Sequence, residues 1–136
     1  MVVTKIKILF LLLSLLAVDT FAQEFNASAD KTTVNQNERF QVYFTFQNGD
    51  INKISNFKPP AFKGLKVLSG PNESRSMQII NGQVSGSLTY SFVVVATDVG
   101  KAEIGGGSLV YNGTALLTDP LSINVVSGSV KRAVPL

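Results

Sequence analysis

The residues that could carry acid–base chemistry are few in this chain and are spread along it. Histidine and cysteine are absent, which excludes the usual nucleophile–base pairs and most transition-metal sites. A serine activated by a lysine remains formally possible. The sequence brings no two carboxylates together as a general acid and base would require. We therefore expect no catalytic residues and no enzyme activity. The acidic residues beyond position 22 are Glu24, Asp30, Glu38, Asp50, Glu73, Asp98, Glu103 and Asp119.

Sites for a metal, a cofactor or a phosphate are not indicated either. Asp50-Ile51-Asn52 begins like a calcium loop, but Ile54 occupies the fifth position and the required glycine is absent. Gly105-Gly106-Gly107 could cradle a phosphate only if a helix followed, and the sequence predicts none. We therefore expect no metal and no cofactor. The glycine run predicts a bulge or a close approach of two backbones.

The composition favours one folded, β-rich domain. The 136 residues are 45% hydrophobic and only 15% charged, against about 25% charged in a typical protein. The net charge of +3, from 12 basic and 9 acidic residues, is too small to indicate a nucleic-acid partner.

The first residues have the three parts of a secretory signal. Lys5 and Lys7 precede an apolar run over residues 8–18, and the small residues Thr20 and Ala22 predict cleavage after Ala22. A permanent membrane anchor is the alternative, but the run is well short of the ~20 residues that a bilayer span needs. An exported domain without cysteine favours a bacterial envelope protein. We expect a signal peptide at 1–22, a β-sandwich at 23–128, and a linker or truncated tail at 129–136.

Apolar residues alternate with a period of two in two long segments, which is typical of half-buried strands. Val93 and Val95 make the second segment apolar on both faces near its end, so we expect that strand to be central in its sheet. The two rows are Phe40, Val42, Phe44 and Phe46, and Leu88, Tyr90, Phe92, Val94 and Ala96.

Two Asn-Gly pairs predict two-residue hairpin turns, because both central residues of a type I′ turn need a positive φ. The turn at Asn81-Gly82 sets Ile79 opposite Val84 and Met77 opposite Gly86. This register places Met77 and Ile79 on the apolar face that carries Leu88. The turn at residues 112–113 sets Leu109 opposite Leu116 and Val110 opposite Ala115.

These patterns predict an all-β fold, an antiparallel immunoglobulin-like sandwich of about 7–8 strands. Further strands are expected at residues 24–29, 66–69, 101–104 and 121–126. The polar segment 69–75 is expected to be a solvated connection, with a recognition loop as the alternative.

One segment combines aromatic, basic and proline residues and is our candidate partner-binding loop. Pro59-Pro60 cannot lie in a central strand, so the segment must leave its sheet there. It could dock a partner protein or an acidic surface. The alternative is a connection between sheets, with its phenylalanines in the core and its lysines in water. The candidate residues are Phe57, Lys58, Pro59, Pro60, Phe62, Lys63 and Lys66.

A series of short motifs resembles, in order, the N-terminal region of the BatD family, the oxygen-tolerance (aerotolerance operon) proteins of Bacteroidetes and relatives. The resemblance covers roughly residues 24–127. The motifs are Phe57-Lys-Pro-Pro-Ala-Phe62, Gly64-Leu-Lys-Val-Leu-Ser-Gly-Pro71, Ser74-Arg-Ser-Met-Gln-Ile-Ile-Asn-Gly82, Leu88-Thr-Tyr-Ser-Phe92, Gly100-Lys-Ala-Glu-Ile-Gly105 and Pro120-Leu-Ser-Ile123.

The resemblance implies a non-enzymatic periplasmic interaction module in an envelope complex linked to oxygen or stress tolerance. It implies envelope proteins with von Willebrand A domains or tetratricopeptide repeats as partners. The resemblance also implies that full-length family members consist of several β-sandwich modules followed by a C-terminal transmembrane helix. Inner-membrane association and any membrane contact would then come from regions beyond this chain. The resemblance supplies no catalytic residues.

A second hypothesis is an exported carbohydrate- or ligand-binding β-sandwich. Such a domain should present exposed aromatic rings on one flat face. The candidates here are Tyr43 and Tyr111, which lie opposite or beyond the core rows.

Overall fold

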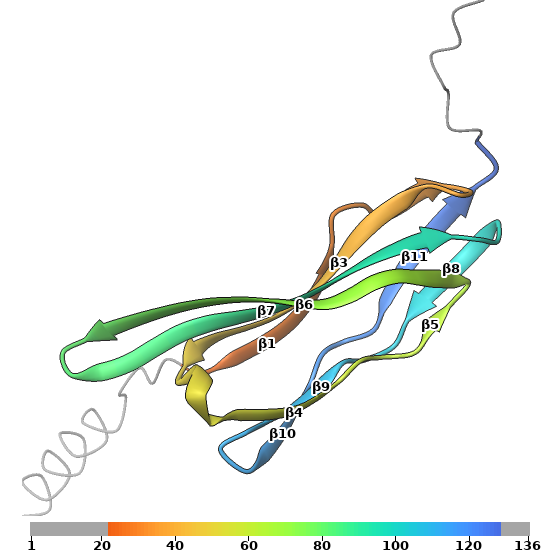
Figure 1. The fold of residues 1–136 in the computed structure, drawn as a ribbon. Coiled ribbons are helices and arrows are strands. Elements are labelled where there is room, and N and C mark those ends of the chain that lie inside the picture. The colour runs from red at the N-terminus through yellow and green to blue at the C-terminus, as the bar shows by residue number, and fades with distance from the viewer. Residues whose placement is uncertain (1–21, 129–136) are drawn as a thin grey trace, which may run out of the picture.

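The computed structural model describes residues 22–128, whose strands form a β-sandwich of two layers (Figure 1), as the sequence predicts. The predicted signal peptide, Ala22 apart, and the predicted tail at 129–136 lie outside the described residues. The elements are β1 (Glu24–Ala29), β2 (Thr33–Asn35), β3 (Arg39–Gly49), η1 (Ile51–Lys53), β4 (Ile54–Lys58), β5 (Phe62–Lys63), β6 (Leu65–Ile80), β7 (Gln83–Ala96), β8 (Gly100–Ile104), β9 (Ser108–Tyr111), β10 (Thr114–Leu117) and β11 (Leu121–Val126).

The first layer is an antiparallel sheet in the order β1-β3-β7-β6. The central position predicted for the Leu88–Ala96 segment is confirmed, since β7 pairs with both β3 and β6. Both predicted apolar rows face the core, and every residue in them is buried. Phe44 lies opposite Tyr90 across the β3–β7 pair, so aromatic rings from the two rows are neighbours.

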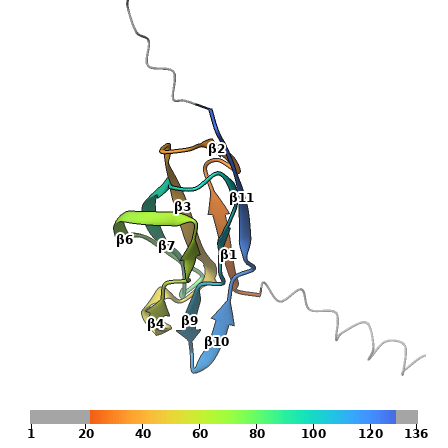
Figure 2. The same cartoon turned by 90° about the vertical axis from the view of Figure 1, so that its right-hand side faces the viewer.

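The second layer consists of two sheets, β2-β11-β8-β5 and β10-β9-β4. The chain passes between them at residues 59–61, 105–107 and 118–120. In Figure 2, β10 and β11 follow one another end to end along this layer. These breaks, together with the short strand β2, raise the number of strands in the described part to eleven. Most pairs are antiparallel as expected, but β2 runs parallel to β11.

Glycines make the breaks possible by letting segments approach closely. A Cβ atom added to Gly107 would lie 2.8 Å from Cδ1 of Phe44, and one added to Gly106 would lie 2.6 Å from the carbonyl oxygen of Thr118. The close approach predicted for the glycine run is therefore confirmed. The Gly105 N–H donates to the Ala61 carbonyl over 3.0 Å, which joins two of the three crossings.

Thr118 holds the third crossing, and its side chain is buried. Its Oγ1 accepts a hydrogen bond of 2.9 Å from the Gly107 N–H, while its own N–H donates to the Gly107 carbonyl over 2.9 Å. The sequence analysis did not single out this residue. Nothing in the sequence near Thr118 indicates that its hydroxyl accepts a hydrogen bond from a residue 11 positions earlier.

We expect Thr118→Val to lower the free energy of unfolding by about 1–3 kcal/mol, because valine keeps the volume but leaves the buried Gly107 N–H without its acceptor. Urea unfolding followed by circular dichroism measures the change. Thr114→Val is the matched control, since Thr114 is exposed in β10 and its loss should change the stability by about 0.5 kcal/mol or less. Equal effects of the two changes would contradict the role of the Thr118 hydroxyl.

The largest departure from the expected strands is β6, which runs from Leu65 to Ile80. The prediction that residues 69–75 form a loop is wrong. The polar and turn-forming residues are tolerated because β6 is an edge strand, where a proline need not donate to a second neighbour. The register against β7 shifts between Ser69 and Asn72, so an irregularity takes up Gly70 and Pro71 without ending the strand.

Candidate interaction surface

The hairpin formed by β6 and β7 extends past the second layer, to the left in Figure 1. Asn81 and Gly82 form its turn with φ values of 51° and 76°, as a type I′ turn requires. The predicted register is confirmed: Ile79 lies opposite Val84 and Met77 opposite Gly86. We call residues 76–87 the hairpin arm.

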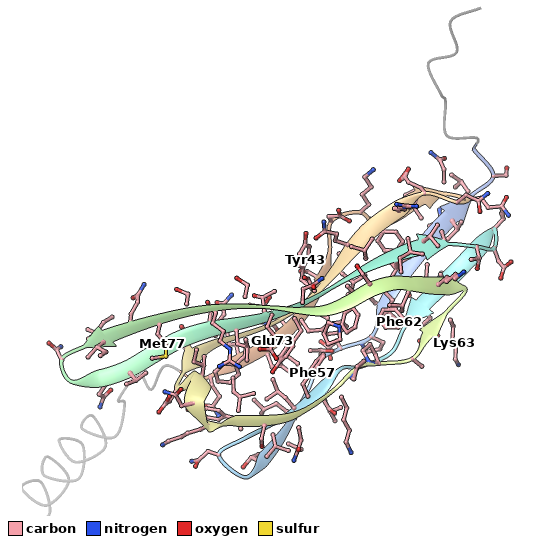
Figure 3. The ribbon with its side chains drawn as sticks, viewed as in Figure 1. Tyr43, Phe57, Phe62, Lys63, Glu73 and Met77 are labelled. Atoms are coloured by element: carbon pink, nitrogen blue, oxygen red, sulfur yellow. The ribbon has the colours of Figure 1, made fainter. Side chains whose placement is uncertain are left out.

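The apolar face of the hairpin arm continues the core row without being buried. Met77 is 51% exposed and Ile79 is 72% exposed. The register confirms the expectation that they lie on the face carrying Leu88, but this part of the face is exposed. Figure 3 shows Met77 on the arm, far from the core residue Phe57. An exposed apolar face of this kind is typical of a protein contact.

The end of the second layer explains why this face is open. Buried Ile51, in η1, reaches the arm, and its Cγ2 would lie 3.2 Å from a Cβ atom on Gly86. Asn52 Nδ2 lies 4.0 Å from the Met77 sulfur. Asp50 caps this turn by accepting a hydrogen bond of 3.0 Å from the Asn52 N–H, which gives its carboxylate a structural partner. Past η1, the described residues offer no strand to cover the arm.

A sequence signal for this open end exists. The first half of β7 reads Gln83-Val-Ser-Gly-Ser87, so a glycine and serines take the place of the bulky residues that follow from Leu88 onward. The core-facing row of β7 therefore has smaller side chains near the turn. This is expected of a hairpin that is not covered by a second layer.

Apart from the exposed Ile80 beside the turn, the opposite face of the arm is polar and uncharged. It borders a hollow of about 420 Å³, and the hydroxyl oxygens of Thr45 and Thr89 lie 3.2 Å apart within it. The arm thus has one polar and one apolar face. The hollow is lined by Thr45, Gln47, Asn48, Ser76, Gln78, Ser85, Gly86, Ser87 and Thr89.

The outer edge of β6 is free in the described structure, because β6 is the last strand of its sheet. In a two-residue hairpin the pair flanking the turn, Ile80 and Gln83, exchanges hydrogen bonds, and such pairs recur at every second residue. The even-numbered residues from 72 to 80 therefore direct their backbone groups toward β7. Residues 73, 75, 77 and 79 direct theirs toward the free edge.

Two charged side chains lie in the middle of this edge. Glu73 Oε2 and Arg75 Nη2 are 3.0 Å apart, and both side chains are about half exposed. Burial raises the pKa of the Tyr90 phenol above its ordinary value of 10.0; Glu73 adds to this increase and Arg75 opposes it. Tyr90 therefore stays neutral near physiological pH and acts as a core residue.

The candidate partner-binding loop becomes β4, a short crossing and β5. The rings of Phe57 and Tyr90 are stacked with centroids 3.8 Å apart, and the Phe62 and Phe92 centroids are 5.4 Å apart. Figure 3 shows Phe57 and Phe62 between the layers, while Lys63 points away from the core. Both phenylalanines are thus engaged in core packing.

The remaining candidates in this segment come from several elements. Lys58, Lys63 and Lys66 are exposed but belong to β4, β5 and β6, which lie in three different sheets. Pro59 is exposed and Pro60 is partly buried at the crossing.

The two tyrosines proposed for carbohydrate binding do not share a flat face. Tyr43 projects from the outer face of the first layer, where its hydroxyl donates to Gln41 Oε1 over 2.9 Å. Tyr111 packs against Phe46 with ring centroids 4.8 Å apart, and its hydroxyl accepts a hydrogen bond from the Asp50 N–H.

Neither a metal-ligand cluster nor a membrane-spanning helix occurs in residues 22–128. No three acidic side chains gather there as metal ligands would. No helix in that range is both long and apolar enough to cross a bilayer.

Comparison with known proteins gives one family and several structures. A family model described as "BatD DUF11 like domain" matches residues 27–125. A search of curated proteins found no match. A non-cellulosomal cohesin from Archaeoglobus fulgidus is 17% identical, with 77% of this chain and 91% of that chain covered and a TM-score of 0.41.

Two further cohesins are similar at the same level. The third cohesin ScaC of Acetivibrio cellulolyticus, in complex with the ScaB dockerin, is 14% identical, with 77% and 99% of the two chains covered and a TM-score of 0.44. A cohesin from a Clostridium thermocellum Coh-OlpC–Doc435 complex is 9% identical, with 80% and 99% covered and a TM-score of 0.38. Likeness this distant says nothing of what the present chain binds.

Proposed function

This chain belongs to the BatD family, and from this premise and its exposed hairpin arm we propose that it is a non-enzymatic interaction module of an envelope complex. The observation that carries the proposal is the continuation of the core row into solvent at Met77 and Ile79. A partner that covers these side chains gains the free energy of removing apolar surface from water, about 25 cal/mol per Å².

The finer parts of the proposal rest on the family. We propose that the protein is exported to the periplasm and acts in oxygen or stress tolerance. The proposed partners are envelope proteins with von Willebrand A domains or tetratricopeptide repeats. The exposed Lys58, Pro59 and Lys63 offer a second, more polar contact at the crossing from β4 to β5.

We expect the double change Met77→Ser with Ile79→Ser to weaken binding to such a partner at least tenfold, because it removes the apolar side chains from the contact. Binding of the full chain to the purified von Willebrand A protein, and separately to the tetratricopeptide-repeat protein, can be measured by calorimetry. Urea unfolding should show little change in the stability of the variant, since both side chains are exposed in the free protein.

Leu117→Ser is the matched control. Leu117 is 72% exposed, as Ile79 is, but it lies in β10 on the other layer. The control should bind as the unchanged chain does. Unchanged binding by the arm variant, or an equal loss in both variants, would contradict the arm as the contact surface.

A further inference from the structure

The free edge of β6 is self-complementary about Ser74. Glu73 and Arg75 carry opposite charges one residue to either side of it. Exposed apolar residues lie toward both ends of the strand, Val67 and Leu68 near the start and Met77, Ile79 and Ile80 at the end. A strand with this pattern matches a second copy of itself running in the opposite direction.

We propose that two copies of this chain pair through β6, antiparallel, with the two Ser74 residues opposite each other. Glu73 of each copy then lies opposite Arg75 of the other. Met77 of each copy lies beside Pro71 of the other, and the start of each β6 approaches the apolar end of its partner. The two four-stranded sheets become one continuous sheet.

The backbone geometry fits this alignment. The groups of residues 73 and 75 point toward the free edge, so these residues form hydrogen-bonded pairs across the dyad. Ser74 directs its groups toward β7, so the Ser74 pair is of the non-hydrogen-bonded kind. The register shift between Ser69 and Asn72 limits the regular hydrogen-bonded ladder between the two copies to residues 72–76. Outside this range the two copies touch through side chains.

The charges select this alignment over others. Charged residues on an edge strand ordinarily discourage pairing. A parallel, in-register pairing would place glutamate against glutamate and arginine against arginine, which is unfavourable for residues directly opposite. The antiparallel dyad at Ser74 converts both contacts into opposite-charge pairs.

This association can be tested separately from the proposed partner contact, although Met77 and Ile79 lie in both. It uses the edge of β6, whereas the proposed partner covers the apolar face of the hairpin arm. The tests below use only the full chain, so their failure would leave the partner contact untouched.

Disulfide trapping tests the alignment directly, because the chain has no cysteine of its own. In a non-hydrogen-bonded pair the Cα atoms lie about 4.5 Å apart, within the range that a disulfide spans. We expect full-chain Ser74→Cys to form a covalent dimer under mild oxidation. Ser76→Cys is the control: Ser76 is also an exposed serine of β6, but its two copies would be roughly 14 Å apart, too far to bridge. Equal rates for the two variants would overturn the proposal.

Charge reversal provides a second test. Glu73→Arg and Arg75→Glu should each weaken self-association about tenfold in sedimentation velocity, because each places like charges opposite one another twice in the dimer. An equimolar mixture of the two variants should form heterodimers, because arginine then faces glutamate at all four positions. The double exchange should also restore the dimer.

Two results of the sedimentation-velocity experiment would overturn the proposed dimer. One is a monomeric unchanged chain at every concentration, which would leave the edge to a different partner strand. The other is a mixture of the variants that associates no better than either variant alone.

Discussion

Replacing Phe44 with alanine is expected to lower the free energy of unfolding by about 3–5 kcal/mol, the largest effect of any single change that we predict. The Phe44 side chain is fully buried in the middle of β3. Its ring centroid lies 5.8 Å from that of Phe92 and 6.0 Å from that of Phe57. Removing the ring leaves a cavity among side chains that come from both layers, so neighbouring elements cannot easily collapse into it.

Urea unfolding of the full chain measures this loss, which is a large part of the roughly 5–15 kcal/mol that stabilises a typical domain. Tyr43→Ala is the control on the same strand, because the Tyr43 ring lies on the outer face and only bonds Gln41. We expect it to cost about 1 kcal/mol or less. A loss below about 1 kcal/mol for Phe44→Ala would mean that the assignment of the buried face is wrong.

Adding a single methyl group at Gly107 is expected to destabilise the domain by about 1–3 kcal/mol. The new Cβ would lie 2.8 Å from Cδ1 and 3.0 Å from Cε1 of Phe44, closer than such atoms pack. The Phe44 ring is itself confined by Phe57 and Phe92, so relief requires a shift of the core or of the crossing. Thermal or urea unfolding provides the measurement.

Gly105→Ala is the matched control at the same crossing. The nearest atom to its added Cβ is 3.7 Å away, an ordinary contact, so we expect a change of about 0.5 kcal/mol or less. In the double variant Gly107→Ala with Phe44→Leu, the smaller side chain leaves room for the methyl group. The loss should therefore be less than the sum of the two single losses. Strictly additive losses would contradict contact between the two residues.

Much of the fold could be predicted because its signals are local. The alternation through Phe40–Phe46 and Leu88–Ala96 defines one face of each strand, and the pleat imposes the same period on the structure. The Asn-Gly turns fix the register, since a two-residue turn with positive φ determines which residues face each other. The pairing of Ile79 with Val84 and of Leu109 with Leu116 followed from this chemistry.

The candidate site was less predictable because exposure depends on residues far away in the chain. Met77 and Ile79 lie on the predicted face, but whether that face is covered depends on where η1 and β4 end. The segment that begins at Phe57 has the composition of a docking loop. The Phe57 ring nevertheless stacks on Tyr90, because β4 packs against β7 in the folded state. Composition alone does not distinguish a ring that meets a partner from one that meets the core.

The faces, the turns and the central place of β7 could be predicted without the structure, because these follow from side-chain period and backbone conformation within a few residues. The length of β6, the breaks in the second layer and the exposure of the hairpin arm became visible only in the folded chain. Those features depend on how far one layer extends over the other. No short segment of the chain encodes that distance, since it is set by contacts among β3, β7 and the crossings at Gly107 and Thr118.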